Sequence, residues 1–229
     1  MSVKAIFLDF YGTVVHEDEK VITNICEQIK ANSQTDATVS EIGGVWWKEL
    51  STLFNESHGE NFIPQRTLEE TSIKRTLSYF QSNLDETKLV NLMFRHWMTP
   101  AIFQDAVEFL KQNTLPVYIL SNIDRSDILE AIHLHQLLFK DIITSEDVKS
   151  YKPGSEMFEH ALMISGLNPN EVIHVGDSLS SDIAGANNIG IKNVWVNRNN
   201  RELKGIIKPD YEINNLKELL NIVKLRVSK

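Results

Sequence analysis

Three carboxylates and one amine stand at positions in the sequence from which they could act together on a charged substrate. Asp9 closes an apolar run that begins at Val3, and Asp177 follows a later apolar run. Asp182 comes five positions after Asp177, and Lys152 lies in a Tyr-Lys-Pro segment before both. A carboxylate at a strand end can act as a nucleophile, whereas converging carboxylates raise one another's pKa unless a cation lies between them. Because Mg²⁺ prefers oxygen ligands and needs few of them from protein, the pattern predicts a nucleophilic aspartate beside a magnesium site.

Each of these residues also has an ordinary structural explanation. Asp9 could end a strand in a turn, and Asp182 could stabilise the positive end of a helix dipole. Lys152 could be a solvated surface lysine, and Ser121 and Asn122 could be turn residues. Their shared place directly after predicted strands favours a site, because ligands bind beyond the carboxyl ends of the strands in an open parallel sheet.

The apolar runs predict a parallel sheet. Five segments have strand character, namely residues 3–9, 116–121, 141–144, 172–176 and 193–196. Four of them are dense in apolar residues instead of alternating, which is typical of strands covered on both faces. Helical patterns accompany the later strands, at residues 104–112, 126–138, 155–165, 180–188 and 216–225. This alternation predicts an α/β fold with right-handed βαβ units.

More than a hundred residues separate the first strand from the second, and they have helical patterns throughout. The segment 21–31 is amphipathic, and residues 85–98 predict a fourth helix. Between them, the capping-box patterns Thr38 to Glu41 and Thr67 to Glu70 predict the starts of two helices. We therefore expect a helical domain at residues 16–98 and an α/β core domain at residues 1–15 and 99–229.

Composition and charge narrow the class of protein. The chain is 42% hydrophobic and 24% charged with a net charge of −8, so it can bury a core, and its field repels nucleic acid and anionic membranes. The single cysteine, Cys26, lies on an apolar helical face and is expected to be a buried thiol. No apolar run reaches the roughly 18 residues that span a bilayer, and Asp9 interrupts the hydrophobic N-terminus. We expect a cytoplasmic protein, monomeric or homodimeric, that acts on a small molecule.

The order of these segments resembles the haloacid dehalogenase (HAD) superfamily of hydrolases. The resemblance rests on the strand end at Asp9, the Ser121-Asn122 pair, the Lys152-Pro153 pair and the segment from Gly176 to Asp182. It extends from about residue 7 to residue 190 and excludes the helical insert. It implies a Rossmann-like three-layer α/β/α core with a parallel sheet. The position of the insert resembles that of the superfamily's C1-type helical cap.

The resemblance also implies a role for each matched residue. The catalytic residues would be Asp9, which attacks the substrate, together with Tyr11 and Lys152. The residues that bind the transferred group would be Gly12, Thr13, Ser121, Asn122 and Lys152. The Mg²⁺ ligands would be Asp9, the backbone carbonyl of Tyr11 and Asp177, with Asp182 supporting the metal shell.

Tyr11 departs from the pattern of the superfamily's phosphatases, most of which have a second aspartate two residues after the nucleophile. A phenol has an ordinary pKa of about 10, so Tyr11 could donate a proton but not act as a carboxylate base. Loss of a general acid–base typically costs about 10²- to 10⁴-fold in rate. His16 could replace it, or could be a linker histidine. The Tyr-Gly-Thr segment at residues 11–13 instead resembles the L-2-haloacid dehalogenase branch.

The first and last motifs therefore favour different reactions. Displacing halide from carbon needs no metal, and the dehalogenase branch lacks the Gly176-Asp177 arrangement. That branch also offers a cap arginine to the halide, a role open here to Arg66 or Arg75. Because uncompensated carboxylates beside Asp9 would be costly, we expect a Mg²⁺-dependent phosphatase first and a dehalogenase second. A third alternative is a HAD-like binding protein with an impaired site.

Overall fold

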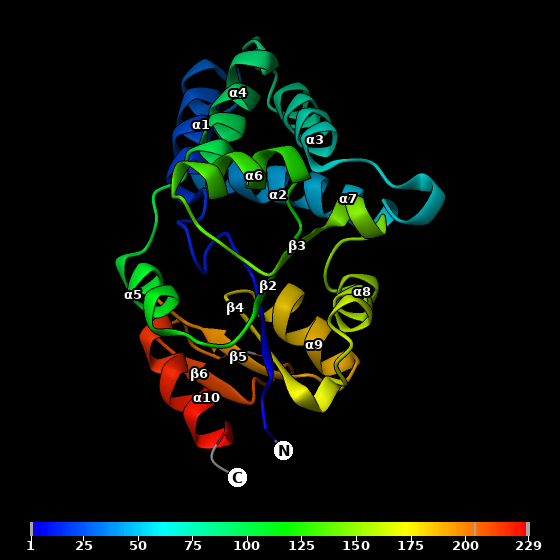
Figure 1. The fold of residues 1–229 in the computed structure, drawn as a ribbon. Coiled ribbons are helices and arrows are strands. Elements are labelled where there is room, and N and C mark those ends of the chain that lie inside the picture. The colour runs from blue at the N-terminus through cyan, green and yellow to red at the C-terminus, as the bar shows by residue number, and fades with distance from the viewer. Residues whose placement is uncertain (1, 204, 228–229) are drawn as a thin grey trace. The chain divides into compact units, whose positions relative to one another are not determined.

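The computed structural model describes residues 2–203 and 205–227 as two compact units (Figure 1). The α/β unit contains the described residues of the segments Met1–Glu17, Ala101–Asn122 and His135–Lys229. The helical unit contains Asp18–Pro100 together with Ile123–Leu134. No helix within the described residues is both long enough and apolar enough to cross a bilayer.

The α/β unit contains a parallel sheet of six strands in the order β3-β2-β1-β4-β5-β6. The strands are β1 (Ala5–Leu8), β2 (Val117–Ser121), β3 (Asp141–Thr144), β4 (Val172–Gly176), β5 (Lys192–Val196) and β6 (Tyr211–Ile213). The predicted parallel α/β fold is thus confirmed, and the strand order is that of a doubly wound, Rossmann-like sheet. The sequence analysis missed β6, which is a three-residue edge strand with only Ile213 fully buried.

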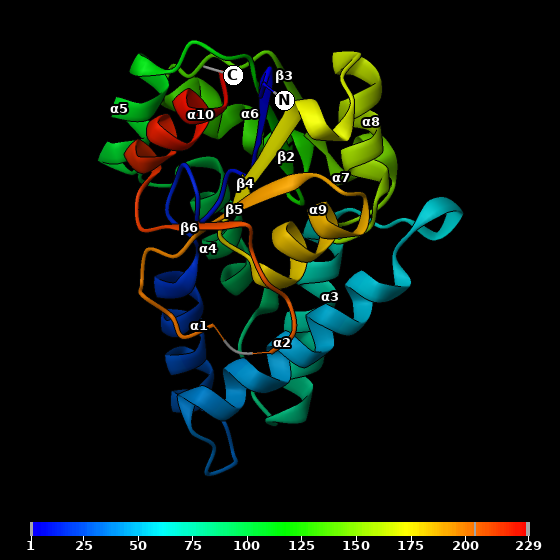
Figure 2. The same cartoon turned by 90° about the horizontal axis from the view of Figure 1, so that it is seen from below.

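Helices cover both faces of this sheet (Figure 2). On one face lie α8 (Glu156–Ser165) and α9 (Ala184–Asn188), and α5 (Gln104–Gln112) packs with α10 (Leu219–Val227) on the other. A one-turn helix, α7 (Ser145–Val148), follows β3. Phe7 and Leu120 of the sheet and Phe158 of α8 belong to one fully buried apolar cluster. Burial of such a side chain contributes about 1.5–3 kcal/mol, so this layer holds the strand ends in fixed positions.

Two predicted helices of the α/β unit have different bounds. The segment predicted as one helix at 180–188 is a π-helical turn, η3 (Leu179–Ile183), followed by α9. The C-terminal segment is a 3₁₀ turn, η4 (Leu216–Glu218), followed by α10. Another 3₁₀ turn, η2 (Pro169–Glu171), precedes β4. Single π turns inside helices often occur at functional positions, and η3 contains Asp182.

The helical unit has its own apolar core. Its elements are α1 (Glu19–Asn32), α2 (Val39–Glu56), η1 (Gly59–Asn61), α3 (Gln65–Tyr79), α4 (Glu86–Met98) and α6 (Arg125–Leu134). Cys26, Trp46 and Trp97 are buried in this unit, as expected for Cys26, and burial raises the pKa of the Cys26 thiol to about 11. The capping box of Thr38 and Glu41 is confirmed at the start of α2.

The second predicted capping box, at Thr67, is wrong. Helix α3 starts two residues earlier, at Gln65, directly after Pro64. The carboxylate of Asp124 accepts the main-chain N–H of Gln65 at 2.7 Å and of Arg66 at 2.9 Å. This cap comes from a residue 59 positions away in sequence from Gln65, so no local pattern indicates it.

The same contacts explain a difference from the expected domain bounds. Helix α6 was expected in the core domain and to extend to residue 138, but it ends at Leu134 and belongs to the helical unit. Gln136 then has a left-handed φ of 52°, which takes the chain out of the helix. Asp127 of α6 pairs with the guanidinium of Arg66, which also lies over the ring of Phe94. These polar contacts, with the cap from Asp124, attach α6 to α3 and α4.

Candidate active site

The carboxyl ends of β1, β2 and β4 place the candidate residues together in the α/β unit. Strand β1 pairs with β2 on one side and with β4 on the other, and the N–H of Asp9 donates to the carbonyl of Val175 at 2.9 Å. Asp9 and Asp177 therefore leave neighbouring strands at the same edge. One carboxylate oxygen from each of Asp9, Asp177 and Asp182 lies within 4.8 Å of the others.

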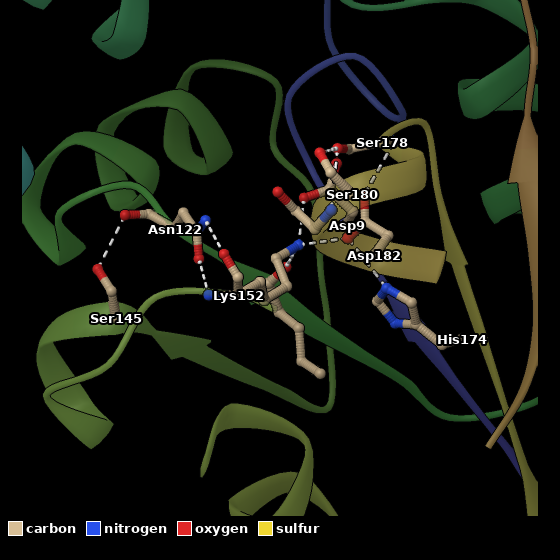
Figure 3. Close-up of polar contacts among 10 residues, drawn as sticks. Asp9, Asn122, Ser145, Lys152, His174, Ser178, Ser180 and Asp182 are labelled. Carbon is tan, nitrogen blue, oxygen red and sulfur yellow. Dashed lines mark hydrogen bonds and ion pairs between the residues drawn. The ribbon is translucent and has the colours of Figure 1, made fainter. Parts of the chain in front are cut away.

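The ammonium of Lys152 links two of these acids, Asp9 and Asp182 (Figure 3). Its Nζ donates to Asp9 Oδ1 at 2.8 Å, to Asp182 Oδ1 at 2.6 Å and to the carbonyl of Leu120 at 2.8 Å. Its three N–H donors are thus matched by three acceptors. Burial alone would lower the pKa of this ammonium, but Asp182 and Asp9 outweigh it and raise the pKa above its ordinary value. Lys152 is therefore a buried cation, not a surface lysine.

The two carboxylate oxygens of Asp9 have different surroundings. Oδ1 is held by Lys152, whereas Oδ2 is buried and accepts no hydrogen bond from the described residues. Burial raises the pKa of Asp9 to about 6, with Lys152 opposing that rise and Asp182 adding to it. A buried oxygen without a donor is costly to leave unmatched. It is therefore positioned to contact a ligand.

Asp177 approaches the turn after β1 closely. A Cβ at Gly12 would lie 2.6 Å from the Asp177 Cγ, so this position requires glycine, which also permits its φ of +83°. Burial, followed by the charges of Asp9 and Asp182, raises the pKa of Asp177 well above its ordinary value. Its main-chain carbonyl accepts from Trp195 Nε1 at 2.8 Å and from Arg201 Nη2 at 2.7 Å.

This donor set fits a hard divalent cation. Asp9 and Asp177 offer carboxylate oxygens, which Mg²⁺ prefers, and Oδ2 of Asp9 has no other partner among the described residues. The buried ammonium of Lys152 pairs with Asp9 and Asp182, whereas Oδ2 of Asp177 lies 3.8 Å from Nη2 of the exposed Arg201. A cation would reduce the repulsion that raises the pKa of Asp177.

Asp182 has partners on both oxygens (Figure 3). Oδ1 contacts Lys152 Nζ and lies 3.0 Å from His174 Nε2, and Oδ2 accepts the N–H of Ser178 at 3.1 Å. Burial alone would raise the pKa of Asp182, but Lys152 and His174 outweigh burial and hold the pKa below its ordinary value. Asp182 is thus a carboxylate that holds Lys152, in addition to lying near the other two acids.

Asn122 and Ser121 follow β2 but differ in their contacts. The Asn122 side chain accepts the N–H of Lys152 at 2.7 Å and donates to its carbonyl at 3.2 Å. The hydroxyl of Ser145 donates to the main-chain carbonyl of Asn122 at 2.8 Å. Ser121 is buried at the end of β2, and Thr13 is fully buried in the turn after β1. The structure therefore gives Asn122 a direct part in holding Lys152.

Tyr11 and His16 have aromatic neighbours. The Tyr11 ring lies edge-on to Phe10, with ring centroids 5.2 Å apart. The His16 ring stacks on Phe103 at 3.9 Å, and the guanidinium of Arg198 lies 3.7 Å from the centroid of the same Phe103 ring. These contacts give His16 a structural role beside Phe103.

The arginines considered for halide binding are paired with acids inside the helical unit. Arg66 forms a two-point contact with Asp127, which is almost fully buried. Arg75 contacts Glu49 at 3.2 Å. Any halide would have to compete with these carboxylates for either guanidinium.

Sequence reasoning missed three residues that support the acids. His174 contacts Asp182, while Trp195 and Arg201 both donate to Asp177. His174 lies two residues before Gly176 in β4, so the period-two alternation of a strand places both on one face. That alternation was the available signal for His174. The contacts of Arg201 come from a loop and have no comparable sequence signal.

Comparison with known proteins agrees with this fold. The model of the haloacid dehalogenase-like hydrolase family matches residues 3–190. The chain is 27% identical over 226 residues, 96% of each chain, to a (S)-2-haloacid dehalogenase from Pseudomonas putida. It is 40% identical over 93 residues, 38% of each chain, to a glyceraldehyde 3-phosphate phosphatase from Methanocaldococcus jannaschii. A solved L-2-haloacid dehalogenase from Xanthobacter autotrophicus superposes with a TM-score of 0.77 at 18% identity, covering 97% of this chain and 98% of that one.

The sheet order defines a Rossmann-like core, and three acids meet at the carboxyl edge of its sheet. The chain belongs to the haloacid dehalogenase-like hydrolase family, as its sequence motifs predicted.

Proposed function

We propose that this chain is a Mg²⁺-dependent phosphatase that acts on a small phosphorylated metabolite through a covalent intermediate on Asp9. The observation that carries the proposal is the third carboxylate: Asp177 lies beside Asp9 and Asp182, and its pKa is raised well above the ordinary value by burial and by their charges. Halide displacement gives no reason to keep such an acid at the site. A phosphoryl group and a divalent cation do.

The metal would be held by the carboxylates of Asp9 and Asp177 and by the main-chain carbonyl of Tyr11. When bound, Mg²⁺ supplies positive charge that stabilises the oxygens of the transferred phosphoryl group. Asp182 would act mainly through Lys152, because its two oxygens already accept hydrogen bonds from Lys152, His174 and Ser178.

In the first step the Asp9 carboxylate attacks phosphorus. A bond forms between Asp9 and phosphorus, and the bond from phosphorus to the substrate's ester oxygen breaks. Lys152 Nζ, already beside Asp9, would bind a non-bridging phosphoryl oxygen, and the hydroxyls of Thr13 and Ser121 would provide further donors. Lys152 would therefore both orient the nucleophile and stabilise the developing charge.

In the second step water attacks phosphorus and releases inorganic phosphate, and Asp9 is restored. The Tyr11 hydroxyl would donate the proton to the leaving alcohol in the first step. That donation leaves a phenolate, whose ordinary pKa of about 10 means that it takes a proton back from solvent near neutral pH before it can activate water. Hydrolysis of the aspartyl phosphate is therefore expected to be the slow step.

A 2-haloacid dehalogenase is the second candidate. Two observations favour it: two relatives that match over 96% of the chain are (S)-2-haloacid dehalogenases, and Tyr11 stands where a phosphatase would have an aspartate. In that reaction Asp9 would displace halide from carbon, and water would then hydrolyse the ester.

A paired assay separates these candidates. Purified protein is given an aryl phosphate with Mg²⁺ or with EDTA and, separately, 2-chloropropionate, and phosphate and halide release are measured. The proposal expects Mg²⁺-dependent phosphate release that is lost in Asp9→Asn and strongly reduced in Asp177→Asn. Halide release unaffected by EDTA would support the dehalogenase. A protein with neither activity that is stabilised thermally by a phosphorylated ligand would indicate a binding protein.

A further inference from the structure

His174 is a fully buried histidine in the middle of the sheet. It lies in β4, opposite Phe7 of β1 and Asn193 of β5. A polar ring is costly at such a position unless it has a hydrogen-bond partner. Its ring lies edge-on to Phe158 of α8, with centroids 4.9 Å apart and an interplanar angle of 81°. An apolar residue would fill this place at less desolvation cost, so the contact made by the ring nitrogen needs an explanation.

That contact is with Asp182. His174 Nε2 lies 3.0 Å from Asp182 Oδ1, the same oxygen that accepts from Lys152 Nζ at 2.6 Å (Figure 3). A carboxylate can only accept, so Nε2 must be the protonated nitrogen. Burial lowers the pKa of His174 below its ordinary value, although the hydrogen bond to Asp182 opposes this.

Asp182 is held from three sides. The π turn η3 brings its side chain back toward β4, where a Cβ at Gly176 would lie 2.2 Å from the Asp182 Cγ. The N–H of Ser178 fixes Oδ2 at 3.1 Å, and His174 fixes Oδ1. Without a donor on the His174 side, the carboxylate could rotate about its side-chain torsions and take Lys152 with it.

We propose that His174 is a positioning residue for catalysis: its Nε2–H orients Asp182 so that this carboxylate holds Lys152 Nζ against Asp9. The inference rests on the proposed function for its effect on rate. The orientation of Asp182 and its coupling to Lys152 do not depend on which substrate the protein binds.

Three variants test the effect on rate. His174→Leu removes the donor, His174→Gln places an amide N–H near the position of Nε2, and Phe158→Leu disturbs the packing of the ring but keeps the hydrogen bond. We expect His174→Leu to lower kcat for the aryl phosphate by about 10- to 100-fold, as loss of supporting hydrogen bonds at such sites typically does. His174→Gln should recover kcat to within about threefold of wild type, and Phe158→Leu should lower the melting temperature while kcat stays near wild type. Wild-type kcat in His174→Leu, or no recovery in His174→Gln, would overturn the proposal.

Two further measurements need no activity. ¹⁵N NMR of the imidazole should show a proton on Nε2, and the signals should shift in Asp182→Asn. A double-mutant cycle of His174→Leu with Lys152→Met, read as the free energy of unfolding, should be non-additive because both residues act on one oxygen. A proton on Nδ1 with Nε2 bare, or additive free energies, would overturn the inference. If the wild type hydrolyses no phosphate ester, the proposed function fails while these two results still decide the role of His174.

Discussion

The side-chain amide of Asn122 is hydrogen-bonded at both of its ends to the main chain of Lys152. Its Oδ1 accepts the N–H at 2.7 Å and its Nδ2 donates to the carbonyl at 3.2 Å, across 30 positions of sequence. The amide therefore fixes the backbone from which the Lys152 side chain reaches Asp9. Ser145, which donates to the carbonyl of Asn122, fixes the amide's own backbone.

Asn122→Ala should release this backbone and lower kcat on the order of 10²-fold, because misplacing a catalytic group by about 1 Å has an effect of that size. Asn113→Ala is the matched control, since the Asn113 amide also bonds a main chain at both ends, to Leu115, at the end of α5. Steady-state kinetics with the aryl phosphate measures both. Equal activities in the two variants would show that the amide does not position Lys152.

Lys152→Met should destabilise the fold by about 3–5 kcal/mol, because it leaves the carboxylates of Asp9 and Asp182 buried without their cation. Lys192→Met is the control, because Lys192 pairs with Asp210 at the surface, where such pairs contribute about 0–1 kcal/mol. Urea unfolding in EDTA gives both free energies. A loss below about 1 kcal/mol in Lys152→Met would contradict the buried ion pair.

Gly12→Ala should abolish Mg²⁺-dependent activity, since the new methyl would displace Asp177. Gly190→Ala provides the control for backbone strain: its φ is +72°, against +83° for Gly12, and a Cβ there meets nothing within 4 Å. Both variants should lose about 1–2 kcal/mol from left-handed backbone. Only Gly12→Ala should lose activity in a Mg²⁺ titration, and retention of full activity there would argue against Asp177 as a ligand.

Glu69 of α3 should make stability depend on pH. Burial, helped by the charge of Asp18, raises the pKa of Glu69 from 4.5 to about 8. The folded chain then binds one more proton than the unfolded chain between pH 4.5 and about 8, so the free energy of unfolding falls as pH rises through that window. The total is on the order of 5 kcal/mol.

Glu69→Gln should remove this pH dependence and stabilise the protein at pH 8. Glu70→Gln, at the exposed neighbouring position, should keep the pH dependence of the wild type. Urea unfolding from pH 5 to pH 8 measures the slope for each variant. A Glu69→Gln protein with the wild-type slope would show that Glu69 is not the group that titrates.

Much of the α/β unit could be predicted from sequence, because strands such as β1 and β4 are buried along their whole length and read as continuous apolar runs. The meeting of Asp9 with Asp177 was predictable for a related reason: the carboxyl ends of parallel strands share one edge. The edge strand β6 lacks that signal, since Tyr211 and Glu212 are not fully buried.

Other features depend on contacts between distant residues, and these leave no local pattern. The start of α3 is set by Asp124 and not by Thr67, and α6 joins the helical unit through Asp127. The role of Asn122 follows from where the Lys152 loop passes, not from the residue type. Sequence could propose Asp182 as a metal ligand, but only the structure shows that its two oxygens already accept hydrogen bonds.

The central claim is that Asp9 is phosphorylated during turnover. The most direct measurement is rapid acid quench of the wild-type protein with excess aryl phosphate and Mg²⁺, followed by peptide mass spectrometry. Because solvent reprotonates Tyr11 before water attacks, we expect a phosphoryl group to accumulate on Asp9 within the first turnover, together with a burst of the released phenol. Steady turnover with no burst and no adduct on Asp9, or an adduct on another residue, would contradict it.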